Sequence, residues 1–148
     1  MQDTKAQTAT RPTLNAEWSK HLIDAAIDAA LDMSVAVTVV VVDESGVLKE
    51  LLRMDGAPLV SLETAINKAY AAAAIGMAPD DFFSAIESDA AAVAEFATRP
   101  GLALIAGGLP LAVDGTVAGA IGVAGAMTGD EDRRIAAIAL EQAAQNNG

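Results

Sequence analysis

The sequence predicts an α+β fold, in which helices pack against a single, mostly antiparallel sheet of five short strands. Two observations lead to this fold class. Apolar, strand-like runs come in a group of two and a later group of three, with Asp- and Gly-containing turns typical of hairpins. The helical segments lie before, between and after these groups rather than after each strand, which favours a sandwich over a βαβ Rossmann unit.

The N-terminal part predicts a tail followed by a helix. Residues 1–12 are polar and aperiodic, so we expect a flexible tail, and we expect residues 13–148 to form one domain. Apolar side chains recur at helical spacing over residues 14–33, and Thr13 is a suitable N-cap.

The first group of strands comes next. Residues 35–42 form a β-branched run that is apolar on both faces, which predicts a central strand covered on both sides. A turn at residues 43–46 leads to residues 47–53, whose mixed character predicts a strand antiparallel to the first.

Two further helices are predicted in the middle of the chain. Ser61 is a suitable cap for a helix that ends near Gly76, and its thin, Ala-rich face would allow close packing on a sheet. Pro79 fits the first turn of another helix, whose apolar side reaches residue 97.

The last third predicts three strands and a helix. Short apolar runs cover residues 102–106, 109–113 and 116–123, and the Asp114-Gly115 pair between the last two is a strong hairpin signal. Thr128 and Glu131 match a capping box for a final helix that reaches about residue 145.

Composition excludes several classes of function. The net charge of −11 disfavours nucleic acid and anionic membrane surfaces as partners. Without cysteine, disulfides, thiolate metal sites and Cys nucleophiles are excluded, and a lone histidine, His21, excludes a multi-His zinc site within one chain. The N-terminus has no apolar signal-peptide core and no run is long enough to span a bilayer, so we expect a cytoplasmic protein.

Five short motifs, taken together and in their order, resemble the GlcG/HbpS-like family. They are VVDESG at 41–46, RMDGA at 53–57, NKAY at 67–70, GGLPL at 107–111 and GAIGV at 119–123. The resemblance covers about residues 13–145 and implies an α/β/α sandwich, with helices on both faces of a five-stranded antiparallel sheet, similar to profilin-like folds.

The resemblance also implies homo-oligomers assembled through helices and sheet edges. Some members of the family bind haem or iron, and the related C-terminal domain of a PduO-type cobalamin adenosyltransferase binds haem. Others lie beside catabolic genes, so the resemblance constrains the fold more closely than the function.

Two cations in the motifs are candidates for binding. Arg53 and Lys68 would hold a carboxylate or a haem propionate, or each would pair with a nearby acid, for instance Arg53 with Asp55. Asp55 itself would shape the loop as an Asx turn or act as a ligand-binding or catalytic carboxylate.

The candidate iron ligand is the single imidazole. His21 would bind haem iron, a position that haem-binding relatives use according to the resemblance, or it is a half-buried helix residue beside Trp18. Met54, Tyr70 and Met77 are alternative axial donors.

Two further groups of residues have a ligand-binding and a structural interpretation. Gly107 and Gly108 would let a ligand approach the backbone, or would permit hairpin geometry and tight subunit contact. Glu131 and Asp132 would contribute to an iron site, or only cap the final helix.

Three functions are consistent with these residues. The first is a cytoplasmic homo-oligomer that binds haem or another small ligand. The second is a cofactor-independent lyase, isomerase or hydratase in a catabolic pathway, in which Arg53 anchors a small carboxylated metabolite and Lys68 or Tyr70 acts as acid or base. The third is an accessory subunit.

Overall fold

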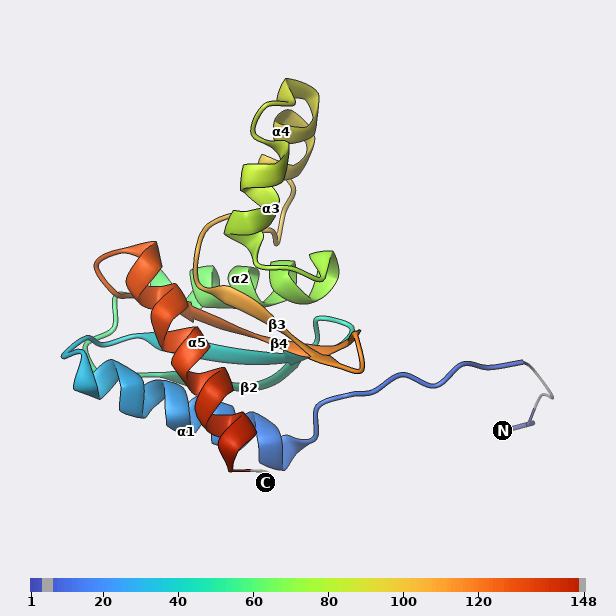
Figure 1. The fold of residues 1–148 in the computed structure, drawn as a ribbon, viewed down its shortest axis with the longest axis horizontal. Helices are drawn as coiled ribbons and strands as arrows, with labels where there is room; N and C mark the ends of the chain where they lie inside the picture. The colour runs from blue at the N-terminus through green and yellow to red at the C-terminus, as the bar shows by residue number, and fades with distance from the viewer. Residues whose placement is uncertain (4–6, 147–148) are drawn as a thin grey trace.

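The computed structural model describes residues 1–3 and 7–146, and Figure 1 shows helices on both faces of one sheet. The elements, in chain order, are α1 (Ala16–Asp32), β1 (Thr38–Asp43), β2 (Leu48–Arg53), α2 (Ser61–Ile75), α3 (Pro79–Ile86), α4 (Ala90–Ala97), β3 (Gly108–Val113), β4 (Thr116–Ala124) and α5 (Gly129–Gln145). The α+β class agrees with the sequence prediction. No helix in the described part of the chain is long and apolar enough to cross a membrane.

The sheet has four antiparallel strands in the order β2-β1-β4-β3, so the predicted five-stranded sheet is wrong. The missing strand is the apolar run at 102–106, which forms an irregular link into β3. Its natural partner would be the chain beyond β4, but β4 ends at Ala124 and Gly125 turns away at φ +121°. The backbone therefore pairs with β4 only from Gly107 onward, where Gly107 accepts a hydrogen bond from Val123.

Strand β1 is central and buried on both faces, as its sequence predicts. Val39 and Val41 belong to the core beneath α1 and α5, whereas Val40 and Val42 belong to the core beneath α2. This alternation follows from the two-residue period of a strand.

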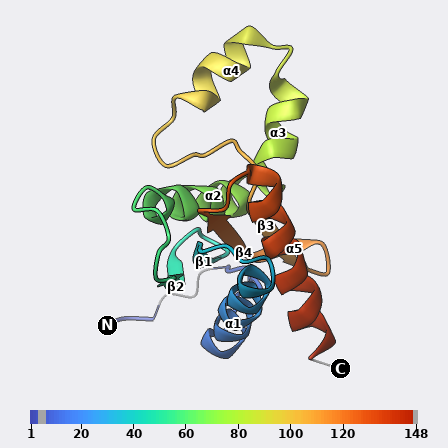
Figure 2. The ribbon, with the colours of Figure 1, turned by 90° about the vertical axis from the view of Figure 1, so that its left-hand side faces the viewer.

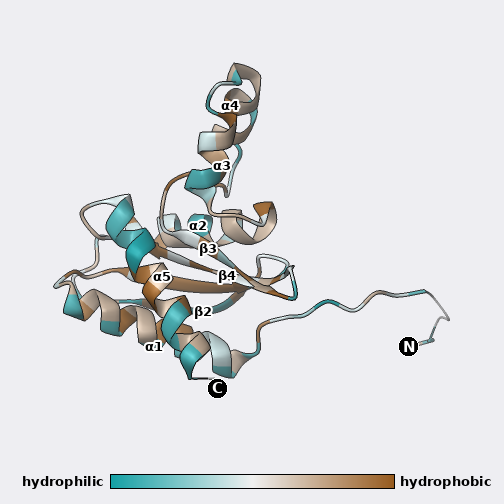
Figure 3. Cartoon of the chain, viewed as in Figure 1, coloured by the Kyte–Doolittle hydropathy of each residue, from teal (hydrophilic) through white to brown (hydrophobic). Residues whose placement is uncertain are grey.

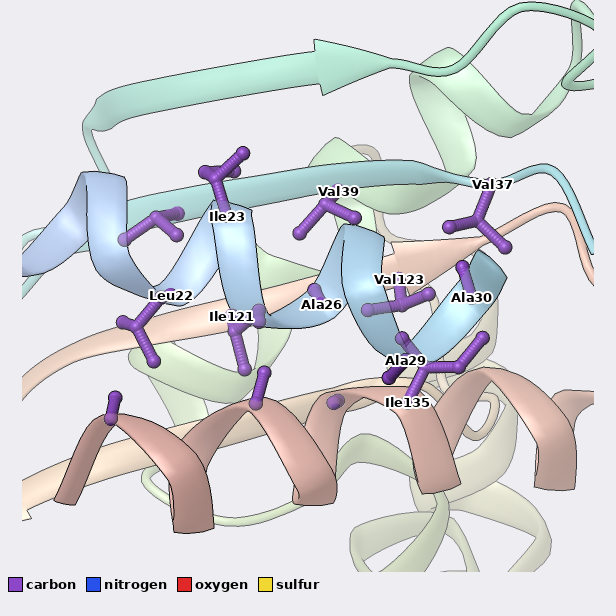
Figure 4. Packing of buried hydrophobic residues seen from close by; sticks show 14 of the residues in the cluster. Leu22, Ile23, Ala26, Ala29, Ala30, Val37, Val39, Ile121, Val123 and Ile135 are labelled. Carbon is purple, nitrogen blue, oxygen red and sulfur yellow. The ribbon is translucent and has the colours of Figure 1, made fainter. Parts of the chain in front are cut away.

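The two cores differ in the size of their side chains. Figure 4 shows Leu22 of α1 beside Ile121 of β4, and Ala29 of α1 beside Ile135 of α5, in the larger core. The core beneath α2 consists of valine and alanine, which lets α2 approach the sheet closely. A Cβ added at Gly122 would lie 2.3 Å from the Ala65 carbonyl oxygen.

The turn and cap predictions near the C-terminus are confirmed. Asp114 and Gly115 both have positive φ, at 49° and 77°, and join β3 to β4. At the start of α5, Thr128 and Glu131 form the reciprocal capping box. By contrast, the cap of α1 is Asn15 rather than Thr13, because the Asn15 side chain accepts a hydrogen bond from the backbone N–H of Trp18.

Residues 79–101, here called the arm, project from the body (Figures 1 and 2). The sequence predicts one helix here, but the structure has two, because Asp89 accepts hydrogen bonds from the N–H groups of Ala91 and Ala92 and caps a new helix. Every residue of α4 is exposed or half-buried.

Figure 3 shows that the first turns of α5 are hydrophilic, in contrast to the hydrophobic β4. In these turns Arg133 donates a hydrogen bond to Asp81, which links α5 to the arm.

Candidate functional site

A cavity of about 240 Å³ lies where the end of β4, the start of α5 and one side of α2 meet. Figure 2 shows the N-terminal end of α5 beside α2. Polar side chains reach the cavity from α2 and from the start of α5: Ser61, Thr64, Lys68, Thr128 and Asp132. A small concave site with a few convergent polar groups is the usual form of a ligand site.

Lys68 and Asp132 form a buried ion pair in the lining of this cavity. The Lys68 ammonium donates to the Asp132 Oδ2 atom at 2.9 Å and to the Val123 carbonyl at 3.0 Å. The other oxygen of Asp132 accepts from the Ala126 N–H at 3.0 Å. The exposed fractions of Lys68 and Asp132 are only 2% and 4%, so both charged groups are desolvated and are stabilised by these hydrogen bonds.

Gly107 and Gly108 pack directly against Lys68. A Cβ at Gly107 would lie 2.8 Å from the Lys68 Nζ atom, and a Cβ at Gly108 would lie 2.4 Å from the Lys68 carbonyl oxygen. Neither glycine lines the cavity, so in this chain they make room for the lysine side chain and for α2. Their role in ligand binding stays a prediction.

The mouth of the cavity is apolar. Val60, Ile105 and Met127 line it and have exposed fractions of 73%, 53% and 89%. The cavity therefore offers charged and hydroxyl groups at its base and hydrophobic contact at its rim, an arrangement that suits a small molecule with one polar end.

Arg53 and Asp55 lie apart from this cavity. Both are exposed, one at the end of the edge strand β2 and the other in the loop that follows. Arg53 pairs in register with Thr38, whose hydroxyl bonds Ser61 of α2, so Arg53 is on the α2 face of the sheet but not in the cavity lining. Their proposed roles as ligand anchors stay predictions.

His21 and Tyr70 are separated from the cavity and from each other. His21 is exposed on α1, which covers the opposite face of the sheet from α2. Tyr70 is on α2 but lines a different cleft, beneath the arm. The structure thus brings together Lys68, Gly107 and Gly108 from the predicted set, and leaves His21, Arg53, Asp55 and Tyr70 elsewhere.

Sequence reasoning linked Asp132 to iron or to helix capping and missed its pairing with Lys68. The sequence held a weak signal, since Asp132 follows a capping box that is complete without it. Among residues 1–3 and 7–146, no group of three His, Asp or Glu side chains is arranged to hold a metal ion. The Lys68 ammonium uses two of its three donors on Asp132 and Val123, which leaves one N–H for a polar group of a ligand.

Comparison with protein families gives a match that covers most of the chain. Residues 14–141 match the family model described as haem degrading protein HbpS-like. A curated relative, an uncharacterized 15.0 kDa protein in the dhaT–dhaS intergenic region of Citrobacter freundii, is 32% identical over 138 residues, covering 93% of this chain and 95% of the relative.

Solved structures show the same similarity. The crystal structure of HbpS has a TM-score of 0.86 at 28% identity, covering 96% of this chain and 98% of that one. A double mutant of HbpS from Streptomyces reticuli has a TM-score of 0.81 at 29% identity, covering 95% and 98%. A complex of PduOC with haem has a TM-score of 0.79 at 29% identity, covering 87% and 94%.

Proposed function

The chain belongs to the HbpS-like family, and from this membership we propose that it is a cytoplasmic, homo-oligomeric haem-binding protein. The observation that carries the proposal is the similarity to the haem complex of PduOC, which extends over 87% of this chain. Haem, when bound, supplies an iron centre whose properties depend on its axial ligands and surroundings.

The donor chemistry of α1 fits haem. His21 offers an exposed imidazole, and Trp18, three residues earlier, is its neighbour on the helix surface. A cavity of about 180 Å³ adjoins Trp18, between the start of α1 and β3. We therefore propose that His21 would hold the haem iron, with Trp18 as its aromatic neighbour on α1.

The cavities of one chain are too small to enclose a haem, which favours binding between copies of the chain. Cavities that enclose drug-sized ligands measure about 300–1,000 Å³, and a haem is larger than most such ligands. The cavity beside Trp18 is below this range and is not lined by His21, so one chain alone would enclose little of a haem held by His21. A second copy of the chain would cover the remainder of the haem.

A haemin titration followed by absorbance tests this proposal. We expect a saturable Soret shift with the wild-type protein and at least a tenfold loss of affinity in His21→Ala. The control is Asp28→Ala, which changes another exposed residue of α1 and should bind as the wild type does. Light scattering should give a mass that is a multiple of 15.0 kDa. Unsaturable binding, or equal affinity in His21→Ala, would refute the assignment.

The Lys68–Asp132 cavity favours a second candidate function, an enzyme that acts on a small carboxylated metabolite. As an ammonium paired with a carboxylate, Lys68 offers a positive charge and a proton, which suits an anchor or an acid better than a base. Lyase, isomerase and hydratase reactions move protons and need no redox cofactor, so Lys68 would serve as the acid in such a step and another group would serve as the base.

Incubation with a panel of small hydroxy and unsaturated acids, followed by NMR, tests this second function. Lys68→Met should abolish any turnover found, whereas Lys49→Met, at an exposed lysine of β2, should retain it. Turnover that persists in Lys68→Met would exclude the cavity as the active site.

A further inference from the structure

A second cleft lies between the arm and the outer side of α2. Its volume is about 330 Å³, within the range of about 300–1,000 Å³ that is typical of small-molecule sites. Tyr70, Ala74 and Ile75 line it from α2, and Phe82, Phe96 and Arg99 line it from the arm. It is separate from the cavity that contains Lys68 and Asp132.

The Tyr70 ring in the wall of this cleft packs closely on Gly46 and lies more loosely against Gly101. A Cβ at Gly46 would lie 2.7 Å from the Tyr70 Cδ2 atom, and one at Gly101 would lie 3.9 Å from Cδ1. The ring is therefore held between the β1–β2 turn and the end of the arm. Tyr70 nevertheless keeps an exposed fraction of 40%, so it remains accessible to a ligand.

The arm side of the cleft is aromatic and carries one positive charge. Phe82 and Phe96 meet edge to face, with ring centroids 5.2 Å apart and planes at 86°. Arg99 places its guanidinium carbon 4.6 Å above the Phe96 ring. It is the charged member of the lining and donates through Nη2 to Glu95, which leaves other N–H donors for a ligand.

We propose that this cleft binds an aromatic monocarboxylate of one or two rings. The ligand ring would pack among Phe82, Phe96 and Tyr70, and its carboxylate would bind Arg99. A guanidinium is well suited to two parallel hydrogen bonds with a carboxylate. The cleft shares no lining residue with the cavity beside Trp18, so this site is distinct from the proposed haem site on α1 and does not depend on it.

The test is calorimetric titration of the full chain with 2-naphthoate, 2-naphthamide and cyclohexanecarboxylate. We expect saturable binding of 2-naphthoate, and weaker binding of the neutral amide and of the non-aromatic acid. Arg99→Gln should weaken 2-naphthoate binding about tenfold or more, and should leave the amide unchanged. Arg134→Gln, at an exposed arginine of α5, is the matched control.

Glu95→Gln gives the opposite sign and tests the role of Arg99 directly. Because Glu95 competes for the guanidinium, its neutralisation should tighten 2-naphthoate binding severalfold. Such a gain cannot result from damage to the arm.

Three results would overturn the proposal. They are an absence of saturable 2-naphthoate binding, equal affinity in Arg99→Gln and Arg134→Gln, and dissociation of an oligomer by 2-naphthoate, which would identify the cleft as an interface between copies. His21→Ala should bind 2-naphthoate normally, so failure of the haem proposal is distinguishable from failure of this one.

Discussion

Asp132 has two partners at the base of the cavity, and each uses a different carboxylate oxygen. Asp132→Asn keeps the shape of the side chain but leaves the buried Lys68 ammonium without its counter-charge. Because removal of one partner strands a buried charge, we expect the free energy of unfolding to fall by about 3–5 kcal/mol. Urea denaturation measures this change.

Two comparisons distinguish the loss of the ion pair from a general effect of removing a carboxylate from the start of α5. Asp130→Asn, at an exposed position in the first turn of α5, should change the free energy of unfolding by less than about 0.5 kcal/mol. The double variant Lys68→Met, Asp132→Asn should be more stable than Asp132→Asn alone, because no charge is left unpaired. A loss below about 1 kcal/mol in Asp132→Asn would mean that the ammonium reaches water.

At the residue scale, the sequence identified one half of this pair. Lys68, Gly107 and Gly108 were candidates from separate motifs, and the structure places them in contact. Asp132 was not linked to Lys68, because the two are 64 positions apart and only the tertiary fold joins them. The sequence also could not show that His21 and Lys68 lie on helices that cover opposite faces of the sheet.

At the element scale, Arg133 ties the arm to α5. Its guanidinium donates to Asp81 at 2.8 and 3.1 Å and to Asp80 at 2.6 Å, which joins the start of α3 to the first turns of α5. Arg133→Gln removes this tie. We expect faster amide hydrogen exchange in α3 by about two- to fivefold, as for a partly exposed ion pair, with little change in the sheet.

The same tie gives the arm a pH dependence. The hydrogen bonds from Arg133 lower the pKa of Asp81 below its ordinary value of 3.8. The contribution of the pair is therefore present above 3.8 and is lost as the pH falls through the lowered pKa. Protection factors in α3, which correct for the intrinsic slowing of amide exchange in acid, should fall in this range in the wild-type protein. A fall of equal size in Arg133→Gln would contradict this assignment.

Elements that depend on local signals were predictable, and those that depend on distant ones were not. The Asp114-Gly115 turn and the Thr128 capping box follow from a few adjacent residues, and both are confirmed. The run at 102–106 has the composition of a strand, yet it lacks a partner because β4 ends at Ala124. The break between α3 and α4 depends on which way the Asp89 side chain bonds.

At the scale of the whole molecule, repulsion among the excess negative charges lowers the stability of the folded state. The net charge of −11 is spread over a chain of 148 residues, and like charges repel more strongly in the folded state. Salt screens exposed charges over about 8 Å at 0.15 M, so the melting temperature at neutral pH should rise by a few degrees from low salt to this concentration.

Differential scanning calorimetry at neutral pH measures the effect, with sodium chloride as the salt. A melting temperature that falls with added salt would mean that favourable ion pairs, such as the tie between Arg133 and the arm, outweigh the general repulsion.

The strand order β2-β1-β4-β3 has a consequence for the kinetics of folding. The β1–β2 and β3–β4 pairs are hairpins that close over short stretches of chain, so each forms early. The central β1–β4 pair must bring together segments separated by α2, the arm and β3, and such non-local pairing slows folding. Since each doubling of a flexible loop adds only about 0.6 kcal/mol to its closure, the arm contributes little to this delay. We therefore expect the transition state of folding to form where the two hairpins join.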